Sequence, residues 1–158
     1  MKVILPAAIV PALPAASFEP ALEEFRVTAK KPLRIALVDD HEMVRQGLRW
    51  LLEDHQEIRV VGEAKDGREA IAMAHELKPD VIVMDVNMPG MNGIEATRRI
   101  VQDQPGVIVI GLSFASEPSV QAAMKNAGAY ACVTKERAAE DIYRAIVDAV
   151  NREPPGKT

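Results

Sequence analysis

Several kinds of residue are scarce in this chain, and each scarcity narrows its class. Among the 158 residues there is one cysteine, Cys132, so an internal disulfide is excluded and a reducing compartment such as the cytoplasm is expected. Only 4% of the residues are aromatic, so the core must depend on Val, Ile, Leu, Met and Ala. No stretch reaches the roughly 18 continuous apolar residues of a membrane span.

Positive charge is also in short supply. The net charge is −4 and the sequence pI is about 5.4, whereas a nucleic-acid-binding protein normally shows a basic face or a high pI. Residues 151–158, which follow the last expected helix, are too few for a helix-turn-helix unit. We therefore expect no DNA binding by this chain alone.

The beginning of the chain differs in composition from the rest. Residues 1–32 are rich in Ala and Pro and show no clean period, which predicts a flexible leader or linker. Three prolines interrupt the apolar run in the first 16 residues, which argues against a secretory signal peptide. We predict one domain over residues 33–150 and a disordered tail over residues 151–158.

Short apolar runs alternate with helical patterns throughout the predicted domain. Such alternation predicts an α/β fold with a parallel sheet covered by helices on both faces. Five strands and five helices favour the flavodoxin-like, doubly wound strand order 2-1-3-4-5. The expected strands are residues 34–38, 58–62, 81–84, 107–112 and 130–133, and the expected helices are residues 43–54, 67–77, 94–101, 118–126 and 138–150.

Polar residues follow the expected strands at their carboxyl ends. Asp39 and Asp40 follow the first strand, Asp85 the third, Ser113 the fourth and Lys135 the fifth. In open α/β sheets this edge binds ligands, so we expect one pocket. Three carboxylates together need a cation, and Mg²⁺ suits oxygen ligands. In such a site Asp85 could attack a phosphoryl group, while the lysine and the serine hold its oxygens.

Each of these residues also has an ordinary explanation when it is taken alone. An Asp before a helix is often its N-cap, as Asp40 could be, and a single Lys or Ser is commonly solvated or part of a turn. Asp85 is harder to explain in this way, because it directly follows the apolar residues 81–84 and precedes a loop with Pro and Gly. The joint placement at four strand ends favours a functional site.

Four segments together resemble two-component response regulator receiver domains. They are VDDH at 38–41, VIVMDVNMPGMNGIE at 81–95, GLS at 111–113 and GAYACVTKE at 128–136. The segment VDDHEMVRQGLRWLLE is similar to the first strand and helix of the NarL/FixJ branch. The resemblance covers about residues 33–150 and implies a CheY-like phosphorylated switch rather than an enzyme with an external substrate.

The resemblance also implies residue roles and partners. The phosphoryl group would come from a histidine kinase or a phosphotransfer protein, and the output would be contact with a downstream protein target. A homodimer is left open, and so is a receiver fragment of a hybrid kinase or a transcription factor. The implied roles are Asp85 as phosphoacceptor, Asp39 and Asp40 as the acidic metal pair, Asn87 as a backbone carbonyl ligand of Mg²⁺, Ser113 as the switch hydroxyl and Lys135 as the phosphate-binding lysine.

A hydrolase of the haloacid-dehalogenase type is the alternative that also forms an aspartyl phosphate. That class resembles D-x-D after the first strand, with the first Asp as the nucleophile. Here Asp39 and Asp40 are adjacent, and the best-placed nucleophile follows the third strand. Mapping the phosphorylated residue separates the two interpretations.

Two positions depart from the receiver pattern. Receivers commonly carry an aromatic residue three positions before the lysine, where this chain has Cys132. The two-residue period of a strand would place Tyr130 on the same face. The residue after the switch hydroxyl is often small, and here it is Phe114, which would either cover the phosphoryl pocket or pack on the fourth helix. We expect a slowly hydrolysed phosphoryl group and weak coupling through the last strand.

Overall fold

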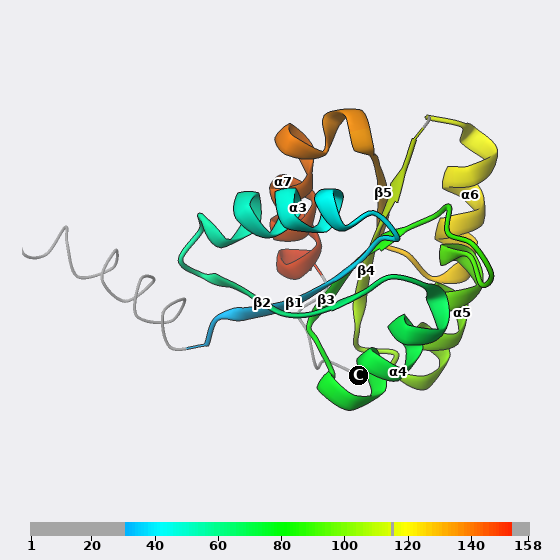
Figure 1. Ribbon diagram of the computed structural model, residues 1–158, viewed down its shortest axis with the longest axis horizontal. Coiled ribbons are helices and arrows are strands. Elements are labelled where there is room, and N and C mark those ends of the chain that lie inside the picture. The colour runs from blue at the N-terminus through cyan, green and yellow to red at the C-terminus, as the bar shows by residue number, and fades with distance from the viewer. Residues whose placement is uncertain (1–30, 115, 153–158) are drawn as a thin grey trace, which may run out of the picture. The chain divides into compact units, whose positions relative to one another are not determined.

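The structure is a computed structural model that describes residues 31–114 and 116–152. The expected leader lies outside the described residues except for its last two, and so does the expected tail beyond Arg152. The described strands and helices alternate along the chain (Figure 1). They are β1 (Leu33–Val38), α3 (Glu42–Glu53), β2 (Ile58–Ala64), α4 (Gly67–Leu77), β3 (Val81–Asp85), α5 (Gly93–Asp103), β4 (Ile108–Ser113), α6 (Pro118–Ala127), β5 (Ala131–Thr134), the short 3₁₀ helix η2 (Lys135–Arg137) and α7 (Ala138–Arg152).

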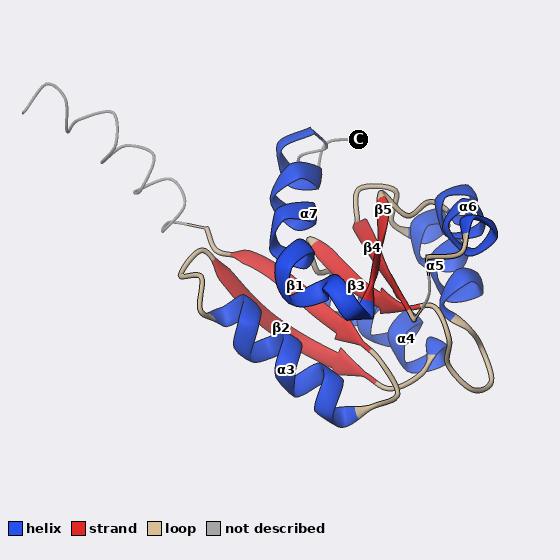
Figure 2. Ribbon diagram, turned by 90° about the horizontal axis from the view of Figure 1, so that it is seen from above, coloured by secondary structure: helices blue, strands red, loops and turns tan. Residues whose placement is uncertain are grey.

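All five strands are parallel and lie in the order β2-β1-β3-β4-β5. The predicted flavodoxin-like order is therefore confirmed. Helices α3 and α7 cover one face of the sheet, and α4, α5 and α6 cover the other (Figure 2). The strand order reverses between β1 and β3, so the carboxyl ends of these neighbours form the crevice where ligands bind in such sheets.

Aliphatic side chains fill both layers between the sheet and its helices. On the α3 and α7 side, Leu52 and Ile142 are fully buried against strand residues such as Val83. On the other side, Ile100 of α5 and Met124 of α6 pack on β3 and β4. The central strand β3 is buried along its whole length, as expected for a parallel strand covered on both faces.

Local signals set several of the helix boundaries. Asp66 and Asn92 are N-caps whose side chains accept hydrogen bonds from backbone N–H groups three residues later, at the starts of α4 and α5. Helix α6 begins with Pro118, and its C-cap is Gly128, which has a φ of 113°. That left-handed conformation suits glycine and ends the helix.

The predicted boundaries differ from the structure at a few ends. Strand β2 continues to Ala64, because an extra residue, Val61, interrupts its register with β1 without ending the strand. Helix α7 continues to Arg152, so the first two residues of the expected disordered tail are helical. The N-cap of α3 is His41, so the N-cap explanation of Asp40 is wrong.

Candidate functional site

The carboxyl ends of four strands bring the expected polar residues to one place. Asp39 directly follows β1, Asp85 ends β3, Ser113 ends β4 and Lys135 directly follows β5. The two aspartates are fully buried, the serine is nearly so, and the lysine side chain is only 10% exposed. Polar groups buried next to an aliphatic core must form hydrogen bonds or ion pairs with one another, because burial without a partner is costly.

The ammonium group of Lys135 joins the two buried aspartates. Its Nζ lies 2.8 Å from Oδ2 of Asp39 and 3.2 Å from Oδ1 of Asp85. One positive charge thus faces two buried negative charges, and Asp40 adds a third carboxylate beside them. The site keeps an excess of negative charge, which favours a cation.

Asp85 shows the effect of this excess. Burial, together with the charge of Asp39, raises its pKa from the ordinary 3.8 to about 6, although Lys135 pulls the pKa down. The backbone N–H of Asn87 donates to Oδ1 of Asp85 at 3.2 Å. Oδ2 of Asp85 is buried and accepts no hydrogen bond from the described residues. Such an oxygen is costly to bury and is open to a ligand.

Metal-ligating groups gather at the start of α3. Asp39, Asp40 and His41 each offer a ligand atom, and these atoms lie within 4.8 Å of one another. Oδ1 of Asp40 is buried and accepts no hydrogen bond from the described residues. The donor set therefore fits a divalent cation. Asp39 and Asp40 were expected here from the sequence and His41 was not, although it follows them directly as the third residue of D-D-H.

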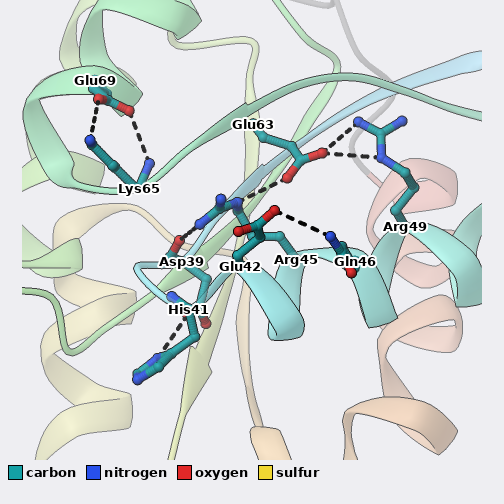
Figure 3. A network of polar contacts seen from close by, with 9 residues as sticks. All are labelled: Asp39, His41, Glu42, Arg45, Gln46, Arg49, Glu63, Lys65 and Glu69. Carbon is teal, nitrogen blue, oxygen red and sulfur yellow. Dashed lines mark hydrogen bonds and ion pairs between the residues drawn. The ribbon is translucent and has the colours of Figure 1, made fainter.

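An arginine network holds this end of β1 in place (Figure 3). Arg45 donates to the backbone carbonyl of Asp39 and to the carboxylate of Glu63 on β2, and Arg49 donates to the same Glu63. Partial burial alone would raise the pKa of Glu63, but the contacts with Arg49 and Arg45 outweigh it and lower the pKa. Helix α3 and strand β2 thereby fix the backbone on which the acidic pair stands.

The close approach of α5 to β3 also positions Asp85. Helix α5 starts at Gly93, where an added Cβ would lie 2.0 Å from the backbone oxygen of Asp85. Only glycine allows the two backbones to come this near.

Ser113 and Cys132 are neighbours on the fourth and fifth strands. The Sγ atom of Cys132 lies 3.9 Å from Oγ of Ser113. Burial raises the pKa of the Cys132 thiol, so it is a poor nucleophile at neutral pH. The thiol packs with the α4, α5 and α6 layer, next to Met124 and Gly111.

The expectation for Tyr130 is wrong. Tyr130 precedes β5, whose first residue is Ala131, so the two-residue period does not extend to it. Its side chain packs in the layer of α3 and α7, opposite to Cys132, and its hydroxyl donates to Asp148 at 2.8 Å. Tyr130 therefore does not replace the aromatic residue that the receiver pattern places at Cys132.

Phe114 lies beside the lysine of the site. Its side chain is 63% exposed, and the ammonium of Lys135 lies 4.4 Å from the centre of its ring. This distance is within the range of a cation–π interaction. The Phe114 ring thus contacts the site through Lys135, and pocket cover by this ring stays a prediction.

Comparison with known proteins places this geometry in a family. Residues 35–147 match the family model described as the response regulator receiver domain. The response regulator GacA of Pseudomonas aeruginosa is 39% identical over 114 residues, which are 72% of this chain and 53% of GacA. The transcriptional regulatory protein LiaR of Bacillus subtilis is 45% identical over 124 residues, 77% of this chain and 58% of LiaR. The chain thus spans about half the length of these curated relatives.

Solved structures agree with this match. The response regulator domain of Thermotoga maritima CheB superposes with a TM-score of 0.73 and 34% sequence identity, covering 78% of this chain and all of that domain. A LuxR-family two-component response regulator from Aurantimonas gives a TM-score of 0.74 at 35% identity, covering 78% of this chain and 91% of that one. Among the described residues, no helix has the length and apolar character to cross a membrane.

Proposed function

This chain belongs to the response regulator receiver domain family, and we propose that Asp85 is the residue that carries its phosphoryl group. Receiver domains of this family are signalling switches of two-component systems rather than classical enzymes. In this proposal the phosphoryl group comes from a histidine kinase or phosphotransfer protein in the cytoplasm. The phosphorylated chain then signals by contact with a downstream protein target.

The observation that carries the proposal is the state of the Asp85 carboxylate. Its Oδ1 is held by Lys135 and by the Asn87 N–H group, while its Oδ2 accepts no hydrogen bond from the described residues. A carboxylate oxygen of Asp85 attacks the phosphorus of a phosphohistidine. The new P–O bond forms as the P–N bond breaks, and the leaving imidazole takes up a proton from solvent. With a pKa of about 6, Asp85 is largely ionised at neutral pH and able to attack.

Two neighbours of Asp85 hold the transferred group. Lys135, whose ammonium is already 3.2 Å from Oδ1 of Asp85, donates to the phosphoryl oxygens. Ser113 ends the adjacent strand β4, which pairs with β3 so that Leu112 lies opposite Asp85. We infer that the hydroxyl of Ser113 donates to a phosphoryl oxygen from the β4 side. Transfer of Lys135 from the carboxylates to the phosphoryl group is the local change that a switch can use.

The proposal includes a divalent cation. Asp39, Asp40 and Asp85, with the backbone carbonyl of Asn87, would hold Mg²⁺ in this site. When bound, Mg²⁺ supplies positive charge that offsets the carboxylates and the phosphoryl oxygens. The donor chemistry supports this, because the charge of Lys135 alone leaves the carboxylates in excess.

Labelling with a small phosphodonor tests the assignment. The protein is incubated with acetyl phosphate and Mg²⁺, and intact mass spectrometry counts the added phosphoryl groups. We expect one group on the wild type, none on Asp85→Asn, and none on the wild type in EDTA. Asp103→Asn, which changes an exposed carboxylate at the end of α5, is the matched control and should label normally. Normal labelling of Asp85→Asn would refute the assignment.

The family match argues against the haloacid-dehalogenase alternative, because the matched model is that of the receiver domain. The same experiment separates the two chemically, since the alternative places the nucleophile at Asp39. Peptide mapping of the labelled protein would then find the phosphoryl group on Asp39 instead of Asp85.

A further inference from the structure

An imidazole stands at the mouth of the acidic site. Nδ1 of His41 lies 3.3 Å from Oδ1 of Asp39 and 3.2 Å from Oδ1 of Asp40. The backbone N–H of His41 donates to Oδ1 of Asp39 at 2.8 Å, which turns that carboxylate toward the histidine (Figure 3). Three consecutive residues thus present two oxygens and one nitrogen to the same point.

Two of the three spacings among these atoms match those between neighbouring ligands of a metal ion. With metal–ligand bonds of about 2.1 Å, neighbouring ligands of an octahedral ion lie about 3 Å apart. The two separations from Nδ1 of His41 are close to this value. Because the His41 side chain is 58% exposed, its ring has the freedom to make the remaining adjustment.

Two of the neighbouring carboxylate oxygens are left available for an ion. Lys135 engages Oδ2 of Asp39, and Oδ1 of Asp39, on the His41 side, accepts the backbone N–H of His41 at 2.8 Å. Oδ1 of Asp40 and Oδ2 of the fully buried Asp85 accept no hydrogen bond from the described residues. Asp85 shares Lys135 with Asp39, so its open oxygen belongs to the same site.

We infer that His41 gives this site a nitrogen ligand and shifts its preference from Mg²⁺ toward divalent transition ions such as Zn²⁺. Mg²⁺ is held by oxygen ligands and keeps several waters, and it gains little from an imidazole. Imidazole is a good ligand for Zn²⁺, Ni²⁺ and Cu²⁺. The inference rests on the metal site of the proposed function, but it requires no phosphoryl transfer.

Metal titration of the whole chain tests the inference. Affinities for Zn²⁺ and for Mg²⁺ are measured separately by isothermal titration calorimetry on the wild type and on His41→Gln. We expect the variant to lose at least about tenfold in Zn²⁺ affinity and to change its Mg²⁺ affinity by no more than about twofold. The His41 side chain makes no N-cap hydrogen bond to α3, so the variant keeps the start of the helix.

A matched control and a spectroscopic readout accompany the titration. The chain has two other histidines, and His75→Gln, in the last turn of α4, should leave both affinities unchanged. In NMR spectra, Zn²⁺ should shift the ring resonances of His41, and Mg²⁺ should not.

The outcomes separate this inference from the proposed function. Equal losses for Zn²⁺ and Mg²⁺ in His41→Gln, or no loss for either, would overturn the inference alone if the wild type still binds Mg²⁺ and labels on Asp85. Absence of any Mg²⁺ binding to the wild type would overturn the metal site of the proposed function as well.

Discussion

Replacing Asp85 by Asn should stabilise the metal-free fold at neutral pH. The carboxylate is fully buried, and its pKa rises from the ordinary 3.8 to about 6 because of burial and the charge of Asp39. At about 1.4 kcal/mol for each pH unit, this rise corresponds to about 3 kcal/mol of instability when Asp85 is ionised. Asn keeps an oxygen that accepts from the Asn87 N–H group but loses the ion pair with Lys135, so we expect a gain of about 1–3 kcal/mol.

The stability that Asp85 contributes to the folded state depends on pH. A carboxyl group whose pKa is raised by folding favours the folded state when it is protonated. Its contribution is fully present below about pH 3.8 and is lost as the pH rises through about 6. The difference in stability between Asp85→Asn and the wild type should therefore be largest at pH 7.5 and should approach zero near pH 4.

Urea denaturation in EDTA at several pH values measures this difference directly. Asp103→Asn, which removes an exposed carboxylate, should change the free energy of unfolding by less than about 0.5 kcal/mol at every pH. The reasoning is refuted if Asp85→Asn is less stable than the wild type at pH 7.5, or if its advantage does not fall as the pH is lowered.

Two further predictions concern residues around Asp85. Phe114→Ala should shorten the half-life of the phosphorylated protein by about two- to fivefold, because a cation–π contact of about 0.5–1 kcal/mol to Lys135 is lost. Phe114→Leu, which keeps apolar cover without the ring, is the control. An unchanged half-life of Phe114→Ala would contradict this prediction. Gly93→Ala should lower the free energy of unfolding by at least about 2 kcal/mol, because the new Cβ would lie 2.0 Å from the Asp85 carbonyl oxygen. Gly47→Ala on α3, where no atom lies within 4 Å of an added Cβ, should instead raise the free energy of unfolding by about 0.5–1 kcal/mol. Equal changes in the free energy of unfolding for Gly93→Ala and Gly47→Ala would contradict this prediction.

The fold was predictable because most of the strands are short, mainly aliphatic runs bounded by polar residues. VIVM is a continuous apolar run bounded by Asp80 and Asp85, and it forms the buried central strand β3. The placement of Asp39, Asp85, Ser113 and Lys135 at one edge then follows from the parallel topology alone.

Side-chain directions near element ends were not predictable from periodicity. Tyr130 lies one residue before β5, where the backbone does not yet alternate as a strand does, and its ring turns to the opposite layer. The position of the His41 ring depends on where α3 begins, because the N-cap residue has extended backbone, with φ −99° and ψ 113°. A sequence pattern fixes that boundary only to within a residue or two.

The packing around Cys132 bears on how a change at Asp85 could spread. Gly111 of β4 lies opposite Cys132 of β5, and a Cβ on Gly111 would meet Cε of Met124 at 2.8 Å and Sγ of Cys132 at 3.0 Å. Cysteine and the fully buried methionine therefore already occupy this space, which leaves a larger ring at position 132 no room without movement of α6. Because the thiol has no ring to reorient, a displacement of Ser113 would act first on Cys132, 3.9 Å away, and then on Met124. Weak coupling through β5 remains our prediction, and this packing favours α6 as the element that responds.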